Sequence, residues 1–243
     1  MRKKRLVSAV LLVLLLAGCG QTGGKLLPSG TGRTDTAAAQ AELPEGAFDG
    51  FDQFTVFTDG PEETVAYVWA LDDAGARWEI AVDPADAEDR EYFVETVLHE
   101  YFHYLSLNDT QVIYTSEQTL DTYNEPGMVT LADSYLNDFY QEFWTGYLDD
   151  CLACDDTYNF FLRHCDDFIT PDASTDPSED ICESFAFFVL RPRDFRADED
   201  VWSRKLDFFY QYPQLVAFRE EVWGNLGLAW GEYFESRQEA DAA

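Results

Sequence analysis

The five residues His99-Glu100-Tyr101-Phe102-His103 constrain the fold of this chain more than any other stretch. Residues four apart on an α-helix lie on the same face, so a helix here presents both imidazoles side by side. Two imidazoles in that arrangement can bind one zinc ion, while the glutamate beside the first one reaches water at the metal. Because two of the chain's three histidines fall in this string, we expect a helix that carries a metal site.

The N-terminus has the pattern of a processing signal. Residues 2–5 are basic, residues 6–16 form an apolar stretch too short for a spanning helix, and Leu16-Ala17-Gly18-Cys19 follows. Small residues before a cysteine resemble a bacterial lipobox, which implies a signal peptide at 1–18 and a lipid on Cys19 that binds the membrane. An ordinary secretory signal is the alternative. Both place the mature chain outside the cytoplasm, and we predict a lipid-anchored, extracytoplasmic protein of the bacterial cell envelope.

The composition separates a tether from a domain. Residues 19–46 are rich in Gly, Thr, Ala and Gln without hydrophobic periodicity, which predicts a flexible tether after the lipidated cysteine. Residues 47–243 are enough for one domain, and an aromatic content of 16% supplies a substantial core. The formal charge of −31 becomes about −35 without the four basic residues of the signal. Such a surface repels phosphate groups, so nucleic acid is excluded as a partner.

The domain is predicted to begin with a small antiparallel sheet and to continue as a mainly helical body, an α+β fold. Alternating or β-branched residues indicate strands at 54–58, 63–71 and 77–82, with a hairpin-like turn at 72–76. Apolar residues at helical spacing indicate helices at 87–107, 128–148, 157–166, 176–191 and 201–235, the last interrupted at Pro213. Strand 77–82 is expected to form the sheet edge to which an extended peptide adds.

Zinc in a catalytic site needs a third protein ligand and one open position. Glu179 and Glu183 lie four apart at the start of a predicted helix, so they share a face. One can ligate the metal while the other accepts a hydrogen bond from a ligand imidazole and fixes its tautomer. Asp176 offers another explanation, because a capping-box-like pair with Glu179 would serve the helix start alone. The coincidence with Glu183 and with the histidine string favours Glu179 as the ligand.

These two motifs carry a family resemblance. An H-E-x-x-H string followed by a helix with E-x-x-x-E resembles the gluzincin metallopeptidases. The run Pro177 to Phe185 is similar to the C-terminal zinc domain of anthrax lethal factor-like peptidases and to bacterial zincin-like lipoproteins. The resemblance implies a zincin-like fold, one Zn²⁺ held by His99, His103 and Glu179, and Glu183 as support. It also implies hydrolysis of a peptide or protein substrate with Glu100 as general base.

The position of the oxyanion donor departs from the family pattern. Lethal factor-like enzymes place a tyrosine shortly before the ligand glutamate, whereas this chain has Asp172, which cannot donate when ionised. Tyr101, Tyr104 and Tyr158 are the candidate substitutes. This departure supports an alternative, a catalytically inactive zincin-fold envelope lipoprotein with a binding or assembly role. An acidic surface protein that sequesters cations is a third hypothesis, and an intact Glu100 favours the enzyme.

Asp109 is the alternative third ligand. The string from His99 to Asp109 resembles the metzincin pattern, in which a turn returns a third ligand to the metal. That pattern requires glycine where this chain has Ser106. Met128 is the only residue available for a Met-turn.

Four cysteines follow the lipidated one: Cys151, Cys154, Cys165 and Cys182. An even number in an exported domain predicts two disulfide bonds, and the sequence leaves all three pairings open. Cys151, Cys154 and Cys165 with His164 can also imitate a second metal site, but an exported chain more often oxidises such cysteines.

Overall fold

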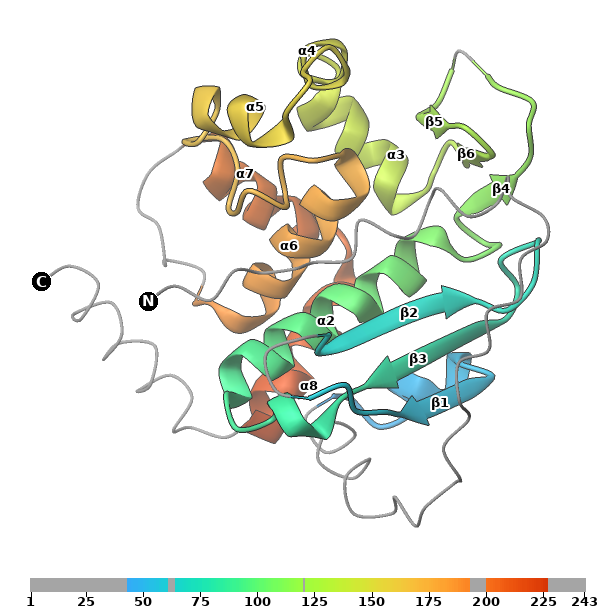
Figure 1. The fold of residues 1–243 in the computed structure, drawn as a ribbon, viewed down its shortest axis with the longest axis vertical. Helices are drawn as coiled ribbons and strands as arrows, with labels where there is room; N and C mark the ends of the chain where they lie inside the picture. The colour runs from blue at the N-terminus through green and yellow to red at the C-terminus, as the bar shows by residue number, and fades with distance from the viewer. Residues whose placement is uncertain (1–42, 61–63, 120, 193–199, 227–243) are drawn as a thin grey trace, which may run out of the picture.

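A computed structural model describes residues 43–60, 64–119, 121–192 and 200–226 (Figure 1). The predicted signal peptide, Cys19 and most of the predicted tether lie outside these residues. The described chain is an α+β fold in which a small sheet packs against a long helix, with further helices beyond it (Figure 1). None of the described helices combines the length and apolarity needed to cross a bilayer.

The first sheet is mixed rather than antiparallel as predicted. It consists of β1 (Gln53–Val56), β2 (Ala66–Ala70) and β3 (Trp78–Val82) in the order β1-β3-β2. β2 and β3 pair antiparallel across the predicted hairpin, whereas β1 pairs parallel to β3. The difference arises because the chain leaves β1, returns as the opposite edge strand β2, and only then turns into the middle.

Strand β3 was expected at an edge, and this prediction is wrong. β3 lies between β1 and β2, so the described edge of the sheet nearest the His99–His103 string is β2. The burial of β3 explains its central place, since Trp78, Ile80, Ala81 and Val82 are almost fully enclosed. A strand buried on both faces reads as a nearly continuous apolar run.

The turn between β2 and β3 forms where predicted. The Asp72 carboxylate accepts hydrogen bonds from the amides of Ala74 and Ala76, each at 3.0 Å. Gly75 has a φ of 67°, a left-handed conformation that glycine adopts readily. A Cβ at position 75 would also collide with the ring of Tyr114. The turn is therefore determined by the hydrogen bonds of Asp72 and by the lack of room for a side chain at position 75.

Two helices build the core of the domain. α2 (Arg90–Leu107) begins at the N-cap Asp89 and ends at Asn108, close to the predicted limits. α6 (Pro177–Leu190) begins at the N-cap Asp176 and ends before Pro192, as predicted. The two helices pack along each other, and the rings of Phe102 and Phe185 stack with centroids 4.1 Å apart. This packing brings the two sequence motifs into one place.

The predicted helix at 128–148 is wrong in its first part. β6 (Met128–Thr130) pairs with β5 (Asn124–Glu125) and with β4 (Val112–Tyr114) in a second small sheet. The helix α3 (Tyr135–Phe139) starts only after the N-cap Ser134 and continues as a π-helical turn, Tyr140–Trp144. The apolar residues at 128 and 131 suggested a longer helix, but the turn at Gly127, with φ 95°, makes a hairpin.

Three of the remaining helices lie in predicted regions: α5 (Thr157–Arg163), α7 (Val201–Phe208) and α8 (Pro213–Leu226). The short helix α4 (Leu148–Leu152) was not predicted, and short 3₁₀ turns lie at Ala47–Gly50, Pro84–Asp86 and Phe209–Gln211. Pro213 separates the last two helices by occupying the first turn of α8, where its missing N–H leaves no bond unmade. The predicted extension to residue 235 lies outside the described residues.

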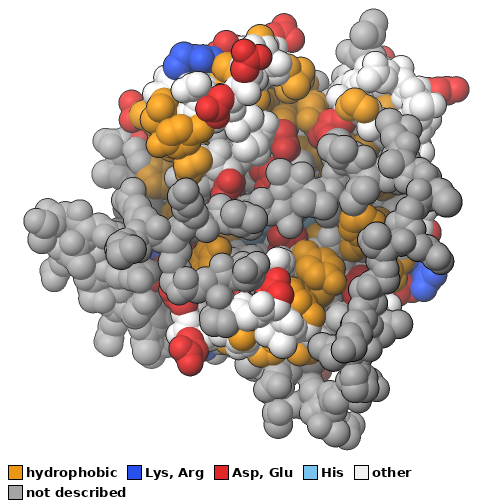
Figure 2. All heavy atoms as spheres, in the orientation of Figure 1, with side chains coloured by type: hydrophobic (Ala, Val, Ile, Leu, Met, Phe, Trp, Pro, Cys, Tyr) orange, Lys and Arg blue, Asp and Glu red, His pale blue; other side chains and the backbone are white. Residues whose placement is uncertain are grey.

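The surface is acidic over the face seen in Figure 2. Asp and Glu side chains are scattered across the described part of this face, with few Lys or Arg among them (Figure 2). This distribution agrees with the formal charge of −31. The exclusion of nucleic acid stays a prediction that rests on this charge.

Candidate metal centre

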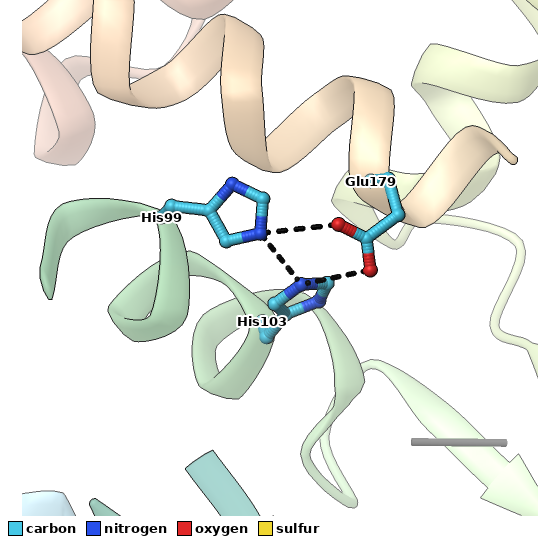
Figure 3. Close-up of side chains that lie close together, drawn as sticks. All are labelled: His99, His103 and Glu179. Atoms are coloured by element: carbon cyan, nitrogen blue, oxygen red, sulfur yellow. Dashed lines mark hydrogen bonds and ion pairs between the residues drawn. The ribbon is translucent and has the colours of Figure 1, made fainter. Parts of the chain in front are cut away.

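Three side chains from α2 and α6 converge on one point. The Nε2 atoms of His99 and His103 are 3.0 Å apart. The two carboxylate oxygens of Glu179 lie 3.2 Å from His99 Nε2 and 3.4 Å from His103 Nε2 (Figure 3). All three side chains are largely buried, with the Glu179 side chain 13% exposed. Among the described residues this is the one group of three such side chains close enough to share an ion.

Glu183 fixes the orientation of His99. Its Oε1 lies 2.9 Å from His99 Nδ1, one helical turn beyond Glu179. A hydrogen bond from Nδ1–H to this carboxylate would keep the proton on Nδ1 when a metal is bound and leave Nε2 free to ligate it. The structure therefore gives Glu183 the supporting position that the sequence predicted for it.

The imidazoles and carboxylates shift one another's proton affinity. Burial lowers the pKa of His99, but the neighbouring carboxylates of Glu179 and Glu183 outweigh burial, and the pKa ends well above its ordinary value. Burial also lowers the pKa of His103, and Glu179 again reverses the direction. Burial raises the pKa of Glu179, yet the two histidines hold it well below its usual range. Positive charge is therefore strongly favoured at this point.

The spacing of the three ligand atoms fits a small cation. Tetrahedral zinc with bonds of about 2.0–2.1 Å separates neighbouring ligand atoms by about 3.4 Å. The observed separations of 3.0, 3.2 and 3.4 Å lie close to that value. Glu179 Oε2 is buried and makes no hydrogen bond despite its closeness to His99. A buried carboxylate oxygen without a hydrogen bond is costly, and a bound metal would satisfy it.

Glu100 lies between the His99–His103–Glu179 group and the first sheet. Its Oε2 accepts a hydrogen bond of 3.1 Å from the backbone amide of Val68 in β2. Burial raises the pKa of Glu100, while His103 and His99 partly offset the rise. A general base works best when its pKa approaches the working pH, so both the position and the shift suit proton transfer.

The cap of α6 serves the site without replacing it. Asp176 Oδ1 accepts hydrogen bonds from the amides of Ser178 at 2.8 Å and Glu179 at 3.1 Å. The backbone of Glu179 is thus part of the cap, as the capping-box alternative required. Its side chain, however, turns to the imidazoles. The helix start and the metal cluster share this residue through different atoms.

Asp109 and the candidate tyrosines lie outside the cluster. α2 continues through Ser106 without the turn that a metzincin ligand needs, and Asp109 is exposed beyond its end, with its amide bonded to the Gly75 carbonyl. Tyr101 is buried and stacks on Phe218.

The other two tyrosines are also placed elsewhere. Tyr104 packs against Phe51 and Trp78, and Tyr158 is exposed on α5. Asp172 is not in the group of described side chains close enough to share an ion, and the oxyanion donor stays unassigned.

The sequence missed Tyr123 and Glu125 in the β5–β6 hairpin. The Tyr123 hydroxyl donates a 2.7 Å hydrogen bond to Glu125. Burial and the nearby Asp176 raise the pKa of Glu125 to about 7, and electrostatic coupling to Glu179 and His103 places it near the cluster. The signal that could have revealed this hairpin is Pro126-Gly127, a strong turn dipeptide directly before the helix predicted at 128–148.

The four cysteines are free thiols in the structure, so neither predicted disulfide is formed in it. Cys182 is fully enclosed in α6, and burial raises its pKa. Cys151 is also buried, with its pKa raised to about 11, whereas Cys165 is exposed. The two disulfide bonds stay a prediction. The alternative second metal site is not among the groups found in the described residues.

Comparison with known proteins gives no relative for this chain. No family model matches it, and no curated protein or solved structure matches it. The likeness to gluzincins therefore stays a resemblance carried by the two motifs, and the function has to be inferred from the site.

Proposed function

We propose that this protein is a lipid-anchored, extracytoplasmic zinc metallopeptidase of the gluzincin type. The observation that carries the proposal is the convergence of His99, His103 and Glu179 with separations suited to one zinc ion. Two imidazole nitrogens and one carboxylate form a known catalytic zinc set that leaves a position open. A zinc ion in this site supplies an electrophile that polarises a carbonyl group and acidifies water.

The chain's own residues divide the remaining work. Glu183 holds the ring of His99, and the Val68 amide holds Glu100 beside the cluster. Glu100 accepts the proton of the attacking water and passes it to the leaving amine. β2, as a sheet edge next to Glu100, replaces the predicted strand 77–82 as the place where an extended peptide would lie.

The metal content of purified protein tests the site. We expect wild type to bind one zinc ion, and His103→Ala and Glu179→Ala to lose it. Asp109→Ala is the matched control, because it removes an exposed acid from the end of the same helix. Zinc retained in Glu179→Ala but lost in Asp109→Ala would contradict the assignment of the third ligand.

Peptide cleavage tests the reaction. Glu100→Gln is expected to keep zinc and lose cleavage of a broad peptide library, because the amide cannot accept the proton. If wild type contains zinc but cleaves none of the peptides, the inactive envelope lipoprotein becomes the better assignment. One observation favours that second candidate: none of the three tyrosines considered from the sequence faces the cluster.

A further inference from the structure

A buried ion pair lies on the neighbouring face of the helix that carries Glu179. Asp180 and Lys205 have side chains with no exposed surface, and Lys205 Nζ lies 2.6 Å from Asp180 Oδ2. Lysine is almost never fully buried in proteins unless it is paired. The pair joins the first turn of α6 to the middle of α7.

Further groups complete the coordination of this pair. The Trp144 indole N–H donates to Asp180 Oδ2 at 2.7 Å, and Lys205 Nζ donates to the Asp167 carbonyl at 2.8 Å. Ser184 Oγ lies 3.4 Å from Asp180 Oδ1. The ammonium group also lies 3.9 Å from the centre of the Phe168 ring. Both charges are therefore satisfied by several directional contacts.

These contacts determine how α6 is rotated about its axis. Successive residues of an α-helix are about 100° apart, so the direction of Asp180 sets the direction of Glu179. Residues 179 and 183 face α2, while residues 180 and 184 face the buried pair. A rotation of α6 that relaxed one set of contacts would displace the other.

We propose that the Lys205–Asp180–Trp144 network is a positioning device for the metal site. It holds the rotation of α6 so that Glu179 and Glu183 both reach the histidines of α2. Its residues touch neither metal nor substrate, and they act through Glu179. This inference rests on the proposed metal site.

The double variant Lys205→Met/Asp180→Leu separates positioning from stability. Replacing both members of a buried ion pair with apolar residues of similar size is often neutral for stability. The double variant then folds but has no directional contact to orient α6. We expect near wild-type unfolding by urea in the metal-free protein, together with a zinc dissociation constant raised by about tenfold or more, the range found for residues that orient ligands.

The measurement is zinc affinity by chelator competition on the full chain in detergent, with the visible spectrum of the Co²⁺-substituted protein as a second readout. Asp150→Asn is the control, because it breaks the exposed pair with Arg163 and leaves α6 untouched. Wild-type zinc affinity and an unchanged cobalt spectrum in the double variant would overturn the inference while leaving the metal site standing. Failure of wild type to bind zinc would overturn both.

Trp144→Phe keeps the test decisive if the double variant does not fold. It keeps an aromatic ring in the core and removes the indole donor to Asp180, at the cost of a smaller ring. We expect a smaller but measurable loss of zinc affinity, about two- to fivefold, if the network orients α6. Unchanged affinity in this folded variant would also overturn the inference.

Discussion

The two faces of the first turns of α6 both bury charge, but they balance it differently. On one face Asp180 forms an ion pair with Lys205. Burial raises the pKa of Asp180 to about 6 and lowers the pKa of Lys205, and the two side chains still balance each other's charge. On the other face Glu179 meets His99 and His103, whose positive charge depends on bound protons. The first face is complete within the chain, whereas the second needs protons or a metal ion. The Asp180 face therefore serves packing, whereas the Glu179 face is suited to binding an ion.

Removing the cation from the Asp180 face is expected to have the largest effect on stability. Lys205→Met leaves the Asp180 carboxylate buried without its cation, which costs about 3–5 kcal/mol in the free energy of unfolding. Urea unfolding of the metal-free protein measures it. Arg163→Met is the matched control, because its pair with Asp150 is about half exposed and such surface pairs contribute little to stability. Equal effects of the two substitutions would contradict the comparison.

Filling the incomplete face is expected to stabilise the protein through binding. At a free zinc concentration 100-fold above the dissociation constant, the free energy of unfolding should rise by about 2.7 kcal/mol. The gain should disappear with a chelator. Thermal unfolding with and without zinc measures it, and Glu179→Gln, which removes the ligand's charge but keeps its shape, should show little gain. A wild type indifferent to zinc would refute the metal assignment.

The Glu125 carboxyl gives the metal-free protein a pH dependence. Its pKa of about 7 in the folded protein exceeds its ordinary value of 4.5. The protonated form therefore stabilises the fold at pH below about 4.5, and this contribution is lost as the pH rises through 7.

Glu125→Gln imitates the protonated form at every pH. Relative to wild type, it should gain on the order of 1–2 kcal/mol between pH 5 and pH 8, an amount reduced for the partial exposure of this side chain. Urea unfolding at the two pH values, with chelator present, measures this difference. A constant difference between the two proteins would show that Glu125 titrates normally.

A helix cap remote from both faces should have the smallest effect. Asp156 is the exposed N-cap of α5, and its carboxylate accepts a 2.9 Å hydrogen bond from the Tyr158 amide. Asp156→Ala should cost about 0.5–1 kcal/mol, the usual value of such a cap. Zinc affinity should not change. A change in zinc affinity would mean that α5 is coupled to the site.

The contacts on the Glu179 face of α6 were easier to predict from the sequence than those on the Asp180 face. The spacing of His99 and His103 and the spacing of Glu179 and Glu183 follow from helix periodicity, which is a local property. The contact between Lys205 and Asp180 joins residues 25 positions apart, and an interior lysine contradicts the usual preference of its type. No local pattern reveals such a partner.

The strands show the same limit. Residues 66–70 and 78–82 alternate in polarity and are joined by a short turn, both of which can be recognised from neighbouring residues. Their hairpin was therefore predictable. The parallel pairing of β1 with β3 depends on how the chain returns after residue 56, which no spacing encodes. The hairpin at Gly127 was not predicted, because the apolar residues at helical spacing after it were given more weight than the turn dipeptide.

Because Tyr140–Trp144 forms a wide, π-helical turn, this part of the chain should tolerate substitutions better than insertions or deletions. Gln141 and Glu142 are exposed within it, so substitutions there should be tolerated. Deleting either residue would change the winding of this turn and with it the direction in which Trp144 points. The indole of Trp144 would then lose its hydrogen bond to Asp180, the residue next to Glu179, so a deletion far along the chain would reach the proposed metal ligand.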